Sequence, residues 1–185
     1  ILKMEYLTHS LIDKSDALQI VQKLKAEKSS WQNGKKTAGS HAAKLKNNFQ
    51  LDKSSKTSQN LKDLIINKII SNPLLKSFTL PSLIHGIMFT KSLAGQGYGM
   101  HIDNPYMPSG RSDLSFTLFL NEPENYQGGE LCIQKTYKTE KIKLSAGEIV
   151  IYPSTQLHSV AEVTNGERYV CVGWIQSYVQ SNEDR

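Results

Sequence analysis

The feature that most limits the possible folds is a dense series of short β-type runs after residue 82. Each run is rich in apolar, β-branched or aromatic residues, and turn-forming residues separate neighbouring runs. The eight runs are 83–90, 97–103, 114–120, 130–134, 141–144, 148–152, 158–163 and 168–176. Runs this short and closely spaced favour a jelly roll, in which two sheets fold over each other and leave a cavity at one mouth.

The first 80 residues show a helical pattern instead. Apolar residues recur at helical spacing in 13–28 and in 61–70, so both segments are expected to form helices, the first behind a possible cap at Ser15. The polar stretch 29–58 is expected to form loops and short strands, with an exposed bend at 52–58. Helices followed by strands predict the α+β class, with the helices packed on one sheet of a double-stranded β-helix (jelly-roll) core.

Length and composition are those of one ordinary domain. We expect a single domain over 1–185, with 1–80 as a helical support region and 81–185 as the jelly-roll core. The two cysteines, Cys132 and Cys171, both lie in apolar runs, so a cytoplasmic location is expected rather than a disulfide framework. No apolar stretch approaches the roughly 18 residues of a membrane span, and 1–10 does not resemble a signal peptide. Secreted and membrane proteins are therefore not expected.

The charge is unevenly distributed along the chain. Residues 1–80 hold 14 basic and 6 acidic residues, a balance of +8, whereas 81–185 hold 8 and 11, a balance of −3. A basic half can attract an acidic partner such as nucleic acid or a ribosome. The lysines are scattered, however, and no basic stripe is interleaved with aromatic residues. A solvated, lysine-rich face is the favoured interpretation.

The sharpest local signal for chemistry is the pair His101 and Asp103. Residues two apart in an extended segment point to the same face, so an imidazole and a carboxylate can meet at one point. His158, at the start of a later run, is a candidate third ligand. Two histidines and one carboxylate form the facial triad of non-haem Fe(II) sites, which leaves three coordination positions open. The His-x-Asp spacing alone is a weak signal, because it often occurs by chance.

The turn between 158–163 and 168–176 decides whether Arg168 can join this site. A two-residue turn at Asn165 and Gly166 would place His158 and Arg168 on opposite faces of a hairpin. A three-residue loop at 164–166, with Gly166 left-handed, would pair Glu162 with Arg168. The second register puts six residues on one mostly apolar face: His158, Val160, Arg168, Val170, Val172 and Trp174. We expect the second register, because burial of that face selects it.

In that second register Arg168 lies inside the β core, where a buried cation needs an anion. A dicarboxylate that chelates the metal with one end can supply the anion with the other. The alternative is a salt bridge between Arg168 and Glu162 on an exposed face. Ser115 and Thr117 present hydroxyls on one face of their run, which can complete the anion site, although threonine is also a common strand residue. Tyr98 either lines the pocket or belongs to the ordinary core.

Nine short motifs resemble those of one known family. They are WQNG (31–34), TAG (37–39), KNN (46–48), HIDN (101–104), RSDLS (111–115), LFLNEP (118–123), YQGGEL (126–131), YPSTQLH (152–158) and WIQS (174–177). Together they are similar to the PKHD-type hydroxylases, a group in the prolyl 4-hydroxylase-like branch of Fe(II)/2-oxoglutarate dioxygenases. The similarity covers most of the chain. One departure is segment 88–97, which lacks the tyrosine that relatives usually place near the cosubstrate.

This resemblance implies a set of roles. The family's iron ligands fall on His101, Asp103 and His158, and its 2-oxoglutarate-binding arginine falls on Arg168. The implied cofactors are Fe(II), 2-oxoglutarate and O₂, with ascorbate as a further possibility. The implied reaction is hydroxylation of an unactivated C–H bond with release of succinate and CO₂.

The resemblance points to a prolyl residue of a peptide or protein as the substrate, with segment 104–111 as a substrate-covering loop. Two alternatives remain: hydroxylation of a free amino acid or other small metabolite, and a non-catalytic jelly-roll interaction module. The motifs specify the oxidant and not the substrate, which leaves the first alternative open. An intact set of ligands with an inward arginine argues against the second.

Overall fold

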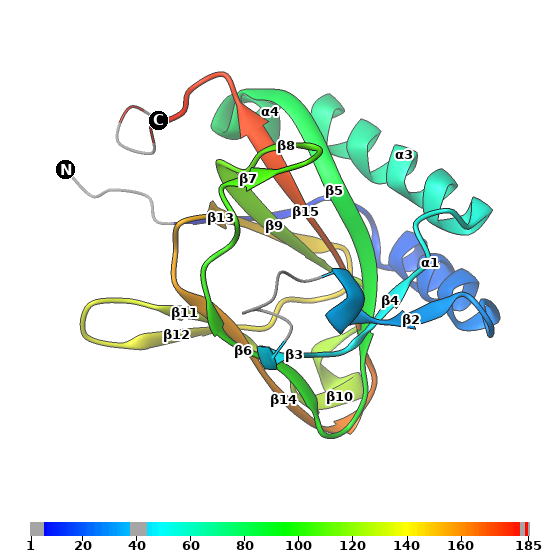
Figure 1. Cartoon of the computed structure of the whole chain (residues 1–185). Coiled ribbons are helices and arrows are strands. Elements are labelled where there is room, and N and C mark those ends of the chain that lie inside the picture. The colour runs from blue at the N-terminus through cyan, green and yellow to red at the C-terminus, as the bar shows by residue number, and fades with distance from the viewer. Residues whose placement is uncertain (1–5, 38–43, 182–183, 185) are drawn as a thin grey trace.

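Two antiparallel sheets face each other, and helices cover the outer side of the larger one (Figure 1). A computed structural model describes residues 6–37, 44–181 and 184. The described helices are α1 (Lys14–Ala26), α3 (Lys56–Ser71) and α4 (Pro73–Thr79), with 3₁₀ turns η1 (Gly34–Thr37) and η2 (Pro123–Asn125). The second and third residues of the TAG motif lie outside the described residues. None of the described helices is long and apolar enough to cross a membrane.

The helix boundaries follow local capping chemistry. Helix α1 begins after Asp13, whose backbone is extended, so the expected cap at Ser15 is wrong and that residue lies in the first turn. Helix α3 begins five residues before the expected segment, because the Ser55 hydroxyl accepts a hydrogen bond from the Ser58 amide as an N-cap. The exposed bend expected at 52–58 is therefore shorter. The structure adds α4, capped by Asn72 and opened by a proline at its first position.

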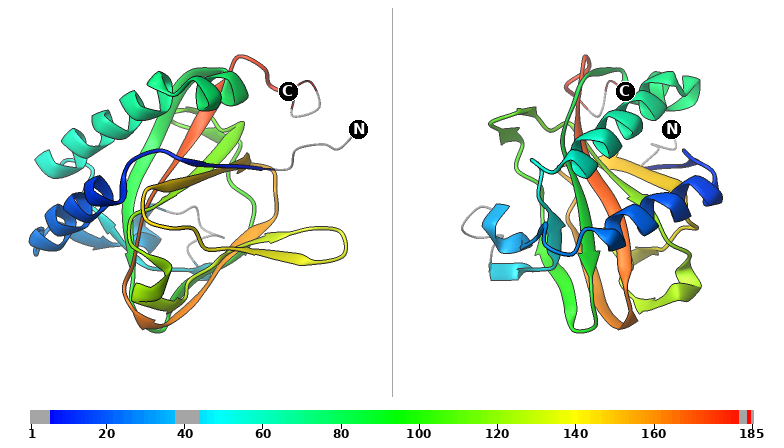
Figure 2. Two further views of the ribbon diagram at one scale, coloured as in Figure 1. Left: turned by 180° about the vertical axis from the view of Figure 1, so that it is seen from behind. Right: turned by 90° about the vertical axis from the view of Figure 1, so that its right-hand side faces the viewer.

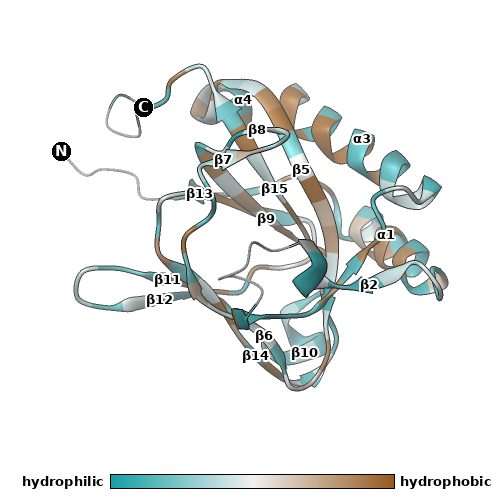
Figure 3. Cartoon of the chain, viewed as in Figure 1, coloured by the Kyte–Doolittle hydropathy of each residue, from teal (hydrophilic) through white to brown (hydrophobic). Residues whose placement is uncertain are grey.

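The helices are amphipathic, and their apolar sides pack on the larger sheet. Figure 3 shows apolar and polar residues alternating along α1 and α3. The side chains that α1 and α3 bury are Ala17, Ile20, Val21, Leu24, Ser58, Leu61, Ile65 and Ile69. The apolar members join a cluster with outward-facing residues of the sheet, such as Leu118 and Cys171. Figure 2 shows the helices on one side of the molecule, as expected.

The larger sheet has the order β1-β13-β9-β15-β5-β4-β2. Its strands are β1 (Leu7–Ser10), β2 (Trp31–Asn33), β4 (Phe49–Leu51), β5 (Pro81–Ser92), β9 (Leu114–Phe119), β13 (Glu148–Pro153) and β15 (Arg168–Ser177). Long pairings of β15 with β5 and β9 form its centre. Strands β2 and β4 come from the polar stretch that was expected to give short strands.

The smaller sheet has the order β12-β11-β14-β6-β3, and β10 also pairs with β14. Its strands are β3 (Lys46–Asn47), β6 (Gln96–His101), β10 (Tyr126–Gly128), β11 (Leu131–Gln134), β12 (Thr139–Ile142) and β14 (His158–Gly166). A separate two-stranded hairpin consists of β7 (Tyr106–Met107) and β8 (Gly110–Arg111). All eight expected runs overlap a strand, although β12 begins two residues early.

The expected hairpin between β14 and β15 is wrong. Strand β14 continues through Gly166 and pairs with β6, β10 and β11, whereas β15 pairs with β5 and β9 in the other sheet. Arg168 therefore lies opposite Ser92 and not Glu162. Gly166 does have the expected positive φ, at 76°. The chain crosses from one sheet to the other at this point because both sides of β14 are already occupied, by β6 on one side and by β10 and β11 on the other.

The space between the sheets holds a second apolar cluster and a cavity. Strand β9 shows how the two faces divide: Leu118 belongs to the outer cluster under the helices, and its neighbour Phe119 belongs to the inner one with Val170 and Tyr152. Beside the inner cluster lies a cavity of about 1100 Å³. Inward-pointing residues of both sheets line it, including His158, Val160, Arg168, Val170, Val172 and Trp174. These are the six residues expected to share one face, and they meet across two sheets instead.

Candidate metal centre

Three expected ligands meet in this cavity. His101 ends β6 and lies directly opposite His158, which begins β14, and Asp103 follows β6 by two residues. One ligand atom from each of the three lies within 4.8 Å of the others. The Nε2 atoms of His101 and His158 are 3.7 Å and 3.9 Å from the Asp103 oxygens Oδ1 and Oδ2. The pairing of two strands thus brings together residues that are 57 positions apart in the chain.

Both imidazoles turn their Nε2 atom towards the Asp103 carboxylate. The Nδ1 atom of His101 lies 2.7 Å from the carbonyl oxygen of Gly99, and that of His158 lies 2.8 Å from the carbonyl oxygen of Gln156. A carbonyl oxygen only accepts, so each Nδ1 carries a proton, and Nε2 is the nitrogen of each ring that can bind a metal. Burial, and next the neighbouring His158, lower the pKa of His101 to about 4. His101 is therefore neutral at pH 7, as a metal ligand must be.

The carboxylate of Asp103 is held by two further donors. Its Oδ2 accepts hydrogen bonds from the Ser115 hydroxyl at 2.6 Å and the Trp174 indole N–H at 3.0 Å. The Ser154 hydroxyl lies 2.8 Å from that of Ser115, and the Ser154 carbonyl accepts from the Asp103 amide. Partners of this kind orient a ligand and tune its affinity for a metal. The donor set of two imidazoles and an oriented carboxylate fits a non-haem Fe(II) site.

Arg168 lines the same cavity as a buried cation. Its side chain comes from the larger sheet, is 3% exposed and lies with its guanidinium carbon 5.4 Å from the centre of the Phe119 ring. Its Nε is buried and has no hydrogen-bond partner in the described part of the chain. Burial lowers the pKa of this arginine. The alternative of an exposed pair with Glu162 is wrong, because Arg168 is buried and lies in the other sheet. The Tyr126 side chain lies close to this guanidinium. A buried guanidinium whose Nε is still unsatisfied fits a carboxylate ligand.

The other sequence candidates all line the cavity. The Tyr98 ring stacks on the His101 imidazole, with centroids 3.7 Å apart. Ser115 contacts Asp103 through its hydroxyl, as described above, and so supports a candidate metal ligand, whereas it was expected beside Arg168. Thr117 also faces inward from β9 and lies between Ser115 and Phe119 along that strand. The Phe119 ring contacts the Arg168 guanidinium.

Sequence reasoning missed the supporting roles of Ser154 and Trp174. Both residues are within motifs that carry the family resemblance, YPSTQLH and WIQS. Their spacing along the chain gave no signal that they reach Asp103, because the contacts join three separate strands and loops.

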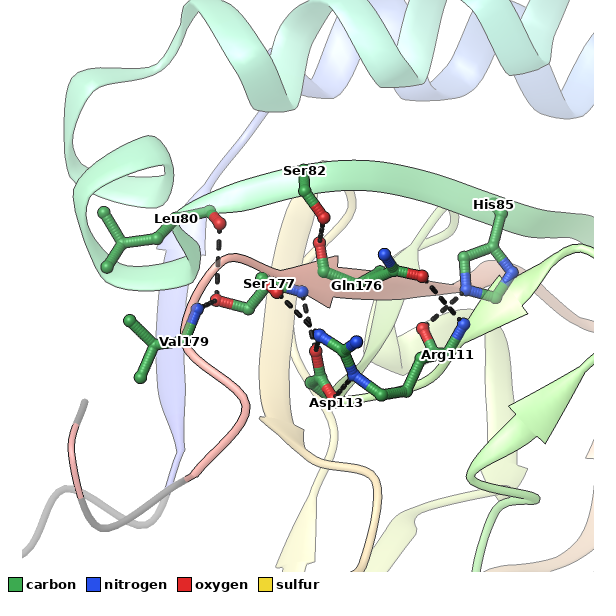
Figure 4. A network of polar contacts seen from close by, with 8 residues as sticks. All are labelled: Leu80, Ser82, His85, Arg111, Asp113, Gln176, Ser177 and Val179. Atoms are coloured by element: carbon green, nitrogen blue, oxygen red, sulfur yellow. Dashed lines mark hydrogen bonds and ion pairs between the residues drawn. The ribbon is translucent and has the colours of Figure 1, made fainter.

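Segment 104–111 contains the β7–β8 hairpin, which is anchored on β5 and on the C-terminal end of β15 (Figure 4). The Arg111 guanidinium makes two parallel hydrogen bonds to the Asp113 carboxylate, at 2.7 Å and 2.9 Å, and a third to the Ser177 carbonyl oxygen. The His85 ring contacts the Ser109 hydroxyl and the Arg111 carbonyl oxygen, at 2.8 Å and 2.9 Å. Residues of this hairpin and its approach, 104, 105 and 107–109, line the cavity. The RSDLS and WIQS motifs meet in this network.

The fold and the cluster of ligands define a 2OG-Fe(II) oxygenase, and a family model described as the 2OG-Fe(II) oxygenase superfamily matches residues 87–176. Within that superfamily, the chain belongs to the PKHD-type hydroxylases. A PKHD-type hydroxylase of Prochlorococcus marinus strain NATL1A is 82% identical over 182 residues, which are 98% of this chain and 82% of that protein. One of strain MIT 9313 is 60% identical over the same coverage. Enzymes of this superfamily use Fe(II), 2-oxoglutarate and O₂.

Solved structures show the same fold at low sequence identity. A prolyl 4-hydroxylase of Pseudomonas putida has a TM-score of 0.66 at 14% identity, with 95% of this chain and 94% of that chain covered. A prolyl hydroxylase of Trichoplax adhaerens, solved with a hypoxia-inducible-factor peptide, has a TM-score of 0.65 at 16% identity, with 92% and 83% covered. A viral collagen prolyl hydroxylase from Paramecium bursaria Chlorella virus 1, solved with 2-oxoglutarate, has a TM-score of 0.60 at 14% identity, with 94% and 97% covered.

Proposed function

We propose that His101, Asp103 and His158 hold the Fe(II) of this hydroxylase and that Arg168 holds the distal carboxylate of 2-oxoglutarate. The observation that carries the proposal is the buried guanidinium, with an unsatisfied Nε, in the same cavity as the three candidate ligands. A dicarboxylate bound to the metal at one end satisfies that cation with the other. Tyr98 and Thr117 line the space beside these groups and are further candidates for cosubstrate contacts. Ascorbate binding stays a prediction that no described feature tests.

The cosubstrates supply the oxidising chemistry, which inserts one oxygen atom into a C–H bond and yields succinate and CO₂. The chain's own contribution is positioning and exclusion of water. Backbone carbonyls fix the two imidazoles, and Ser115 and Trp174 fix the carboxylate. Apolar side chains such as Val170 and Leu131 line the cavity walls and keep the reacting groups dry.

We further propose that the substrate is a prolyl residue in a peptide or protein. Two observations support this substrate class: the prolyl hydroxylases among the structural neighbours, and the β7–β8 hairpin, which contributes to the cavity wall and can cover an extended chain. A free amino acid or small metabolite is the second candidate, because the cavity also accommodates a compact substrate.

We also propose that the fold is a double-stranded β-helix and that the chain forms one domain. Two facing antiparallel sheets are typical of a double-stranded β-helix, which supports that assignment. The outer cluster joins residues of the N-terminal helices to residues of the larger sheet, which supports one domain over 1–185. We propose a cytoplasmic enzyme, because the two cysteines of the chain are buried and unpaired. The scattered N-terminal lysines support no specific contact with nucleic acid.

Incubation with proline-containing peptides tests the function directly. We expect the enzyme with Fe(II), 2-oxoglutarate and O₂ to add the mass of one oxygen atom to a proline peptide and to release succinate in proportion. The same peptides with pipecolic acid or alanine in place of proline serve as matched controls, and free L-proline tests the small-metabolite alternative. O₂-dependent succinate release without any peptide hydroxylation would contradict the prolyl substrate. Absence of O₂-dependent succinate release with every substrate would favour the non-catalytic module.

A further inference from the structure

Lys46 is a second buried cation in the cavity, and neither the candidate metal ligands nor the cosubstrate site uses it. The residue is the first of β3, the edge strand of the smaller sheet. Its side chain lines the cavity and the residue is only 7% exposed. In the described ranges, no carboxylate forms an ion pair with its ammonium group and no polar group hydrogen-bonds to it. A buried charge without a partner is costly, so a bound anion is the expected complement.

The strand register places Lys46 beside the candidate metal site. Lys46 lies opposite Tyr98 on β6, and Tyr98 in turn lies opposite Val160 on β14. Figure 1 shows these three strands side by side. The Lys46 ammonium is 5.4 Å from the centre of the Tyr98 ring, and that ring stacks on the His101 imidazole. One aromatic ring therefore separates the ammonium from a candidate metal ligand.

The Lys46 ammonium stays protonated, but no described carboxylate neutralises its charge. Burial lowers the pKa of the ammonium to about 8, while Asp103 raises it and Lys53 lowers it further. The group is therefore still mainly protonated at pH 7. Asp103 does not serve as its ion-pair partner, because both carboxylate oxygens face the two imidazoles, Ser115 and Trp174. The contact with the Tyr98 ring offsets only part of the cost of burying the charge.

Lys46 and Arg168 approach the cavity from different sheets. Arg168 comes from β15 in the larger sheet, and Lys46 comes from β3 in the smaller one. Under the function proposed above, the two carboxylates of 2-oxoglutarate are taken by the metal and by Arg168. Lys46 is then left for a third anionic group, and the substrate is the remaining molecule that enters the cavity.

We propose that Lys46 binds a carboxylate of the substrate and so selects substrates that are anionic near the carbon to be hydroxylated. This inference rests on the proposed function and specifies its substrate class. The carboxylate can come from two sources: the main-chain carboxylate of a terminal or free proline, or the side chain of an acidic residue next to a prolyl residue. An ammonium group that is fixed beside the aromatic stack discriminates such substrates from neutral isosteres through a charge-assisted hydrogen bond.

Matched pairs of carboxylate and amide ligands test the proposal. The protein is loaded anaerobically with Mn²⁺ and 2-oxoglutarate, and binding is measured by calorimetry. The pairs are N-acetylproline with N-acetylprolinamide, acetyl-Pro-Glu-amide with acetyl-Pro-Gln-amide, and acetyl-Glu-Pro-amide with acetyl-Gln-Pro-amide. We expect the carboxylate of at least one pair to bind about tenfold more tightly or better, and the pair that shows this identifies the source of the carboxylate.

Substitutions assign the preference to Lys46. Lys46→Met keeps the length of the side chain and should reduce the preference to about threefold or less, while Lys46→Arg should retain most of it. Lys53→Met, at a neighbouring exposed lysine that also lines the cavity, should leave the preference intact. Lys46→Gln replaces Lys46→Met if that variant does not fold. Affinity for 2-oxoglutarate should be unchanged in all of these variants.

The outcomes separate this inference from the proposed function. Equal binding of both members of every pair, or a preference that survives both Lys46→Met and Lys46→Gln, would overturn the role of Lys46 alone. A loss of 2-oxoglutarate affinity in Lys46→Met would assign the ammonium to the cosubstrate and overturn it as well. If no member of any pair binds, the prolyl substrate class fails and the inference fails with it.

Discussion

The two candidate ligand histidines are oriented in the same way, each by the carbonyl oxygen two residues earlier in the chain. Gly99 serves His101, and Gln156 serves His158. This hydrogen bond needs no particular side chain at the accepting residue, so no sequence pattern predicts it. That these three candidate ligands would cluster was predictable, because the His-x-Asp spacing puts two donors on one face and few other residues offered a third. The hydrogen bonds from Ser115 and Trp174 to Asp103 were not predictable, because they depend on how separate strands pack together.

Removal of the guanidinium by Arg168→Ala should weaken 2-oxoglutarate binding far more than metal binding. Under the proposed function the lost group pairs with the distal carboxylate, so its removal would leave that carboxylate buried without a partner, at a cost on the order of 2–4 kcal/mol. Titration of the Mn²⁺-loaded protein with 2-oxoglutarate measures the loss, and a separate Mn²⁺ titration should be unchanged within a few-fold. Arg168→Lys, which keeps the charge but loses the two-pronged geometry, should be intermediate. Unchanged affinity of Arg168→Ala for 2-oxoglutarate would show that Arg168 does not bind the cosubstrate.

At the scale of elements, the positions of the strands were predictable and their partners were not. Apolar alternation and turn residues located all eight expected runs. The β14–β15 connection was misassigned because a short link with an Asn-Gly pair suits a tight hairpin, and local sequence does not show that β10 already pairs with the end of β14. The six residues expected to face inward do line the cavity. Side chains alternate between the two faces of a strand, so the inward residues can be predicted whichever sheet the strand joins.

The crossing between the sheets can be tested at Gly166. Its φ is +76°, and a side chain there would press on the Asn125 carbonyl oxygen and on Tyr126. Gly95 is the matched control, because its φ is +80° but an added Cβ would meet nothing within 4 Å. Gly95→Ala should cost only the left-handed strain of roughly 1–2 kcal/mol, and Gly166→Ala about 1–3 kcal/mol more. Urea unfolding measures both, and equal losses would show that the close approach to β10 does not matter.

At the scale of the whole molecule, the functional groups are divided between two sheets. The candidate metal histidines belong to β6 and β14 of the smaller sheet, whereas Arg168 belongs to β15 of the larger one. The inner apolar cluster includes residues of both sheets, such as Leu131 and Val170. A ligand held by both the metal and Arg168 would therefore link the two sheets across the cavity.

This division predicts that metal and cosubstrate stabilise the fold together. Mn²⁺ with 2-oxoglutarate should raise the Tm by more than the sum of the shifts that each ligand gives alone, because only the chelated cosubstrate links the histidines of one sheet to Arg168 of the other. At 100 times its Kd, such a ligand contributes about 2.7 kcal/mol, which for a chain of this size corresponds to a shift of roughly 5–10 °C. Thermal unfolding followed by circular dichroism checks this. Arg168→Ala should retain the shift with metal alone and lose the excess, whereas an excess that persists in that variant would mean that the cosubstrate reaches the larger sheet through another residue.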